Sequence, residues 1–344
     1  GIIGRHSFEL CSKPRIISSA SYVGDKEGKG PLRECFDKIC RDDTLGLDSW
    51  EQAESRMFES AVRVALAKIK RQSDDLSCLL GGDLLNQIIS SGFAAREIRA
   101  PFIGLYGACS TISEGLMLGG MLVDGGFAEL AACAASSHFS AAERQFRYPL
   151  EMGVQAVPSS QRTVTGAGSI IIQAAGEFRP GAGNVFEHVA LTGGTIGSVE
   201  DFGITDANNM GAAMAPAAFK TIKAHLSDYS RRVEDYDRII TGDLGIFGSD
   251  MLYELLRGEG IEIADRHEDC GKLMFSPEQN VNCGASGCGC AATIMSSWFL
   301  PKIESGEIRR VLFLATGALM SPVSSLQGES IPSIAHAVVI EHID

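Results

Sequence analysis

The feature that most constrains the fold of this chain is an internal duplication. An apolar run followed by a Gly-Asp-Leu turn occurs twice, as LLGGDLL at 79–85 and as IITGDLG at 239–245. A Gly-Ala start followed by a long, weakly charged segment also occurs twice, from Gly107 and from Gly284. Two strand-like runs then follow in each copy. They lie at 128–137 and 165–173 in the first copy, and at 309–319 and 334–342 in the second. A set of landmarks repeated in one order indicates two similarly folded halves.

Strands that alternate with helices predict α/β layers with largely parallel sheets. The two Gly-Ala segments have almost no polar face, and a helix that is apolar all round must be covered on every side. Segments 49–69 and 215–229 have an apolar stripe and exposed charges, so we expect them outside. The Gly/Pro-rich joint at 176–184 divides the chain into halves 1–180 and 181–344. The pattern predicts two buried helices between two sheets, with amphipathic helices on both outer faces.

Charge and composition narrow the classes of partner. The net charge of −13 argues against nucleic acid, because phosphate binding needs a basic surface. The ten cysteines lie mostly in apolar segments and no signal peptide opens the sequence, so we expect reduced thiols inside the cell. In the longest uncharged run only Ala291 to Leu300 is helix-like and apolar, too short to cross a bilayer. Any membrane contact is therefore expected to be peripheral or through partners.

These features resemble the superfamily of thiolases and ketoacyl synthases over nearly the whole chain. The resemblance implies a duplicated thiolase-like fold, a five-layer αβαβα sandwich, and a homodimer formed through sheet edges of the first half. A more specific set of motifs resembles the stage V sporulation protein AD family of spore-forming Firmicutes. Those motifs are GDLLNQ, GACST, LVDGGFA, SSHFSAAERQFRYPLE, GITDANNMGAAMAPAA and SGCGCAA.

The family resemblance implies a ligand that the residues alone would not name. It implies binding of dipicolinic acid, pyridine-2,6-dicarboxylate, as the free acid or as its calcium chelate. It also implies action with other stage V sporulation A operon proteins at the spore inner membrane, in uptake of the acid into developing spores and its release in germination. We expect no cofactor, since the Gly-x-Gly of TGAGS at 165–169 lacks the helix and acidic residue of a dinucleotide site.

Cys109 is the candidate nucleophile. In superfamily enzymes the Cys of this turn takes the acyl group, and a helix start favours a thiolate. A nucleophile also needs a base, but the thiolase His falls on Cys290 and the ketoacyl synthase His falls in the turn of Asp243. An Asp would oppose a thiolate by like-charge repulsion. We therefore favour a catalytically silent pocket, with an acyl-CoA or acyl-carrier thioester enzyme, condensing or hydrolytic, as the alternative.

The segment ASSHFSAAERQFRYP follows a strand whose carboxyl end would face ligands, so His138, Arg144 and Arg147 are binding candidates. The alternative is that both Arg side chains pair with Glu143 or Glu151, or serve a dimer interface. If the ligand is the calcium chelate, Asp243 would face the metal. The complete set of expected ligand-binding residues is Cys109, His138, Arg144, Arg147, Asp243, Asn282 and Cys290.

A cysteine cluster near the start of the second buried helix invites a zinc hypothesis, which we reject. The spacing of Cys283, Cys288 and Cys290, with His267 and Cys270 upstream, matches no finger or ribbon pattern. Close packing of small residues explains them better, so no metal site is expected.

The two methionines of ITDANNMGAAMAPAA, Met210 and Met214, are interpreted as core fillers.

Overall fold

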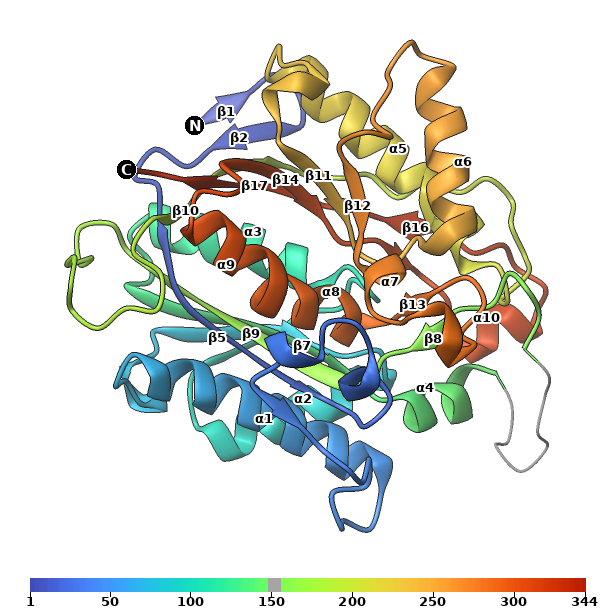
Figure 1. The fold of residues 1–344 in the computed structure, drawn as a ribbon, viewed down its shortest axis with the longest axis horizontal. Coiled ribbons are helices and arrows are strands. Elements are labelled where there is room, and N and C mark those ends of the chain that lie inside the picture. The colour runs from blue at the N-terminus through green and yellow to red at the C-terminus, as the bar shows by residue number, and fades with distance from the viewer. Residues whose placement is uncertain (148–155) are drawn as a thin grey trace.

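The structure is a computed structural model that describes residues 1–147 and 156–344. Figure 1 shows two stacked sheets with helices between them and on both outer faces. The first sheet has the order β6 (Phe102–Gly104), β5 (Cys78–Gly82), β7 (Leu130–Ser137), β9 (Gly166–Gln173) and β3 (Arg15–Val23). The second has the order β12 (His267–Asp269), β11 (Arg238–Thr241), β14 (Arg310–Leu314), β17 (Ala337–His342) and β10 (Val189–Thr195).

The two sheets have the same strand directions. β5 runs parallel to β6 and β7, whereas β9 runs antiparallel to β7 and β3. The second sheet repeats this arrangement with β11, β12, β14, β17 and β10. The expectation of largely parallel sheets is confirmed for four strands of each sheet, and one strand of each, β9 and β17, runs opposite to the others. Antiparallel neighbours need no crossover helix across the sheet, and among the described residues the α-helices in these connections are the short α4 (Phe139–Phe146) and α10 (Pro322–Leu326).

Smaller elements complete the fold. One residue pair, Ala190 with Arg15, links the edges of the two sheets, and the N-terminal β2 pairs with β10 of the second half. The short strands are β1 (Ile2–Ile3), β2 (Ser7–Glu9), β4 (Lys38–Ile39), β8 (Arg162–Thr163), β13 (Ala285–Ser286), β15 (Gly317–Ala318) and β16 (Ser333–Ile334), and the remaining short helix is α7 (Cys270–Leu273).

The central layer confirms the prediction of two buried helices. Helix α3 (Thr111–Asp124) contacts strands of both sheets, and every residue of α8 (Cys288–Ile294) is buried. A π-helical turn (Met295–Phe299) joins α8 to α9 (Leu300–Glu304). Proline has no N–H and collides with the carbonyl one turn back in a regular helix, so the wider turn accommodates Pro301.

The outer layers also follow the sequence pattern. Helices α1 (Trp50–Lys68) and α2 (Ile89–Ile98) cover the first sheet, and α5 (Met210–Asp228) and α6 (Gly245–Arg257) cover the second (Figure 1). Ser49 caps α1 by accepting a hydrogen bond from the Gln52 N–H at 3.2 Å. α5 begins five residues before the predicted start at 215, because Asn209 caps it, and Met210 and Met214 therefore lie on this helix. In the described residues, no helix combines the length and apolarity that crossing a membrane requires.

The contact between the central layer and β9 generates a stability prediction. A Cβ on Gly168 would lie 2.3 Å from the backbone oxygen of Ala292 in α8, so Gly168→Ala must push the helix and the sheet apart. We expect the free energy of unfolding to fall by about 1–3 kcal/mol. Gly92 in α2 has nothing within 4 Å of such an atom, and Gly92→Ala should raise the same quantity by about 0.5–1 kcal/mol. Chemical denaturation measures both, and equal effects would contradict this packing.

Candidate functional site

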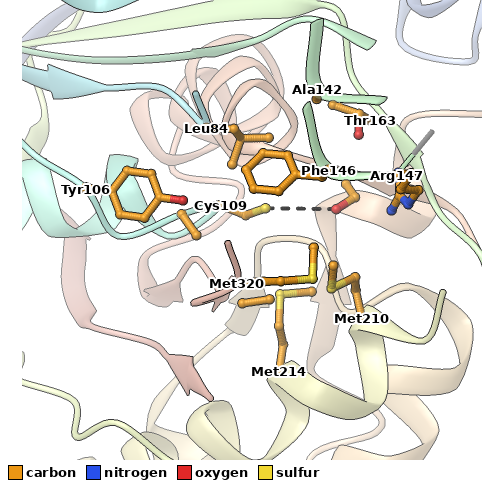
Figure 2. A pocket seen from close by; sticks show the side chains of 13 residues that line it. Leu84, Tyr106, Cys109, Ala142, Phe146, Arg147, Thr163, Met210, Met214 and Met320 are labelled. Carbon is orange, nitrogen blue, oxygen red and sulfur yellow. Dashed lines mark hydrogen bonds between the residues drawn. The ribbon is translucent and has the colours of Figure 1, made fainter. Parts of the chain in front are cut away.

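A pocket lies between the two halves, beside the N-terminal ends of the central helices α3 and α8. Figure 2 shows its walls, with Leu84 and Phe146 on one side of the Cys109 sulfur and three methionines on the other. The residues that line it are Leu84, Tyr106, Ala108, Cys109, Ala142, Phe146, Arg147, Thr163, Met210, Met214, Ser286, Ala318 and Met320. The cavity has a volume of about 50 Å³. That volume holds only about three or four water molecules.

A tight turn places Cys109 at this pocket. Ala108 has a φ of 49°, a left-handed conformation that is uncommon for a residue with a side chain, and α3 begins two residues after Cys109. The thiol is buried, and its Sγ lies 3.9 Å from the Oγ of Ser286 (Figure 2). Ser286 comes from β13, directly before Gly287 and the start of α8. The sulfur of the first half therefore faces a hydroxyl of the second half.

Asp243 fixes this hydroxyl from behind the pocket wall. Its Oδ2 accepts hydrogen bonds from the Ser286 Oγ and the Gly287 N–H, each at 2.9 Å, and its Oδ1 accepts one from the Thr316 Oγ1 at 2.9 Å. The carboxyl group is buried and is not among the residues that line the cavity. Burial raises the pKa of Asp243 to about 6, although these hydrogen bonds act in the opposite direction.

The environment of Cys109 favours the neutral thiol. Burial and then the charge of Asp243 raise the pKa of Cys109 well above the usual value for a cysteine. The expectation that the helix start would favour a thiolate is therefore wrong here. Desolvation and a like charge outweigh the effect of a helix dipole, which falls off within the first turn.

No imidazole lines the pocket. All seven histidines of the sequence lie in the described residues, and none is among those that line the cavity. Cys290, at the position of the thiolase histidine, is fully buried, and its Sγ lies 3.5 Å from the backbone oxygen of Gly242. In the described part of the chain, the polar side-chain groups that act on the Cys109 thiol are the Ser286 hydroxyl and the Asp243 carboxyl group.

The structure gives His138 and Arg144 roles outside the pocket. His138 caps α4, where its Nδ1 accepts from the Ser140 N–H at 3.2 Å and its Nε2 lies 2.7 Å from the Asp43 backbone oxygen. Its ring is fully buried, and this burial lowers its pKa. Arg144 forms an ion pair with Glu51.

Arg147 lines the pocket and also forms an ion pair with Glu143, one of the two partners expected from sequence. Its side chain is 13% exposed, and its Nε is buried without a hydrogen-bond partner among the described residues. The other expected partner, Glu151, lies outside the described residues.

Asn282 lies in a neighbouring cavity instead of the Cys109 pocket. Its Nδ2 donates to the Val157 backbone oxygen at 3.1 Å and to the Ser160 Oγ at 3.3 Å. This second cavity has a volume of about 180 Å³, and Arg147 lines it as well as the first. Of the seven residues expected from sequence, the structure thus brings Cys109 and Arg147 together in the Cys109 pocket and places the other five elsewhere.

Sequence reasoning missed several residues of the pocket. The two Gly-Ala segments align Cys109 with Ser286, so the duplication itself contained the signal for the hydroxyl that faces the sulfur. Met210 and Met214, interpreted as core fillers, line the cavity together with Met320. Tyr106 and Thr163 also line the cavity. They lie in short segments, in which the order of apolar and polar residues does not distinguish a pocket wall from a turn.

The cysteines of the rejected zinc hypothesis make separate packing contacts. The Cys288 thiol donates to the Ala108 backbone oxygen at 2.9 Å, and the Cys283 Sγ accepts from the Phe247 N–H at 3.3 Å. Within the described ranges, no group of three or more His, Cys, Asp or Glu side chains is arranged to hold a metal ion.

Solved structures share this fold at low sequence identity. A variant of OleA from Xanthomonas campestris superimposes with a TM-score of 0.60 at 12% identity, over 99% of this chain and 100% of that one. The 3-oxoacyl-[acyl-carrier-protein] synthase III of Aquifex aeolicus gives a TM-score of 0.54 at 12% identity, over 96% of this chain and 100% of that one. At this identity the likeness shows the fold alone, and it confirms the predicted thiolase-like architecture.

Sequence comparison is more specific than fold similarity, because it identifies the family of the chain. The stage V sporulation protein AD of Bacillus subtilis is 44% identical over 326 residues, which are 95% of this chain and 94% of that protein. The family model described as Stage V sporulation protein AD (SpoVAD) matches residues 4–341. The chain therefore belongs to the stage V sporulation protein AD family, as its motifs predict.

Proposed function

We propose that this sporulation protein is a non-catalytic binding protein for dipicolinic acid, which it serves to take up into developing spores and to release in germination. The observation that carries this proposal is the chemistry around Cys109. The sulfur faces a serine hydroxyl that a buried carboxyl group holds, and no histidine lines the pocket. A thiol without a base is a poor acyl acceptor, since acid–base catalysis contributes about 10²- to 10⁴-fold to such reactions.

The pocket walls suit a flat aromatic ring. Phe146 and the thioethers of Met210, Met214 and Met320 form two facing walls (Figure 2). Sulfur–aromatic contacts are favourable, and methionine has three rotatable bonds with which to adapt. The present cavity of about 50 Å³ is too small for a pyridine dicarboxylate. Binding therefore requires these methionine side chains to move.

Local donors must bind the carboxylates, because the net charge of −13 repels an anion at long range. Arg147 supplies a guanidinium group at the pocket, and Tyr106 and Thr163 supply hydroxyl groups. A guanidinium group binds a carboxylate through two parallel hydrogen bonds, which are about twice as strong as neutral ones. We propose the free dianion as the ligand, since both oxygens of Asp243 are already engaged and that residue does not line the cavity.

We expect the protein to associate peripherally with the spore inner membrane through other stage V sporulation A operon proteins. We also expect it to form a homodimer through the edge of the first sheet. β6 is an edge strand, and exposed apolar side chains surround it: Ile89, Phe93, Ile103 and Tyr106. Light scattering tests the dimer, and a mass of 36.6 kDa at micromolar concentration would rule it out.

A bulky substitution tests where the ligand binds. We expect calorimetry to detect dipicolinate binding to the unmodified protein and its loss in Cys109→Trp, because the indole would fill the pocket. Cys11→Trp, at an exposed cysteine, is the matched control and should bind as before. Thermal melting checks that both variants fold. Unchanged affinity in a folded Cys109→Trp variant would place the ligand elsewhere.

The pH dependence of binding tests the form of the ligand. The pKa of Asp243 is about 6, so this group loses most of its negative charge as the pH falls from 7.5 to 5.5, and the repulsion of a dianion falls with it. The dissociation constant should decrease on acidification, by about tenfold per pH unit at most for one linked proton. Asp243→Asn should flatten this profile. Binding of the calcium chelate through Asp243 would give the opposite slope, and that result would reject the free dianion.

A further inference from the structure

Two buried carboxyl groups lie behind the wall of the Cys109 pocket, and the proposed function does not use them. Glu54 lies on α1 and is 1% exposed, and Asp83 directly follows β5 and is 0% exposed. Asp83 also directly precedes Leu84, which lines the pocket. In the first half Asp83 has the place that Asp243 has in the second, since both belong to the duplicated Gly-Asp-Leu turn.

Asp83 has the contacts of an ionised carboxylate. Its Oδ1 accepts a hydrogen bond from the Leu85 N–H at 2.8 Å. Its Oδ2 accepts from the Ser91 N–H at 2.8 Å and from the Ser91 Oγ at 2.6 Å. Several donors of this kind favour the charged form of a carboxyl group. Through them Asp83 ties the start of α2 to the end of β5.

Glu54 has the contacts of a neutral carboxyl group. Its Oε1 accepts from the Ser136 Oγ at 2.9 Å, while its Oε2 is buried without a hydrogen-bond partner among the described residues. In those residues, neither Glu54 nor Asp83 forms an ion pair with a Lys, Arg or His side chain. Burial, and after it the charge of Asp83, raise the pKa of Glu54 well above its usual value. Two interacting carboxyl groups without a cation resist double ionisation, so the pair holds one proton.

The titratable groups that act on this pair from neighbouring positions supply no counter-charge. Glu51, one turn earlier on α1, adds negative charge and is itself paired with Arg144 of α4. The Cys288 thiol of α8 and the Tyr106 phenol both interact with Asp83, and burial raises the pKa of each, so both stay neutral. The bound proton is therefore what limits the charge of the pair.

The segment that Asp83 holds has a strained backbone. Gln87 and Ile88 are consecutive residues with φ of 54° and 47°, in the left-handed region. That conformation is uncommon for any residue with a side chain and is an outlier for a β-branched one. Such a backbone persists only where surrounding contacts hold it. Here the contacts to Asp83 lie on both sides of the strained pair, at Leu85 and Ser91.

We infer that Glu54 and Asp83 form a proton-dependent latch on residues 84–91. With one proton on the pair, Asp83 holds the strained segment closed and keeps Leu84 in the pocket wall. Loss of the proton leaves two negative charges in a buried site without a cation, which is costly, and opening of the segment admits the water that solvates them. The pocket wall therefore becomes less stable as the pH rises. This inference does not depend on the ligand proposed for the pocket.

The direction of the pH effect follows from linkage. The closed form binds a proton that the opened form releases above the ordinary pKa of a glutamate, about 4.3. The stability of the closed form is therefore full below that pH and is lost as the pH rises.

Hydrogen exchange of the Leu85 and Ser91 amides tests the latch, because both N–H groups are bound to Asp83. Between pH 6 and 8.5 we expect their protection factors, after correction for the intrinsic exchange rate, to fall by up to about tenfold per pH unit. In Glu54→Gln, which has the shape of the protonated acid and cannot ionise, the same protection factors should be nearly independent of pH.

Glu59→Gln is the matched control on the same helix. Glu59 pairs with Arg63, so its removal should leave the slope of the unmodified protein unchanged. A flat profile in the unmodified protein would overturn the inference, whether or not Glu54→Gln folds, and so would an equal slope in a folded Glu54→Gln variant. Failure of dipicolinate to bind at Cys109 would contradict the proposed function and leave the latch intact.

Discussion

The structure depends on two central helices that have no polar face. Every residue of α8 is buried and α3 contacts strands of both sheets, so each sheet supplies one wall and the outer helices must cover the far sides. Close packing is possible because glycine occupies the contact, as at Gly168 against Ala292. This arrangement also brings the starts of α3 and α8 together, and it is there that Cys109 meets Ser286.

The duplication gives the site its chemistry as well as its position. Cys109 and Ser286 occupy equivalent places in the two repeats and face each other across the boundary between the halves. Asp243 then holds Ser286 and Gly287 with one carboxyl oxygen and Thr316 with the other. A carboxyl group at this position stabilises the backbone at the start of α8 but raises the pKa of the thiol, which suits a binding pocket better than an acyl-transfer site.

Much of the fold could be predicted from the sequence, because repeats and apolar periodicity report burial directly. The buried helices and the outer helix at 50–68 follow from such patterns, whereas the family follows from the resemblance of specific motifs. Strand direction follows only in part, because one strand of each sheet, β9 and β17, runs opposite to the others. Site residues are harder still, because side-chain direction depends on tertiary contacts. His138 turns inward as a helix cap and Arg144 pairs with Glu51, although both stand in a segment that resembles a ligand-binding loop.

The Cys109 pocket contains a buried thiol, and no histidine that could act as its base lines the cavity. Intact-mass spectrometry after incubation with acyl-CoA at pH 7 tests this most directly, because transfer to Cys109 forms a thioester, releases free CoA and adds the mass of the acyl group. No adduct is expected on the unmodified protein. A stable acyl adduct that disappears in Cys109→Ala would contradict it and restore the thioester enzyme as the function of this chain.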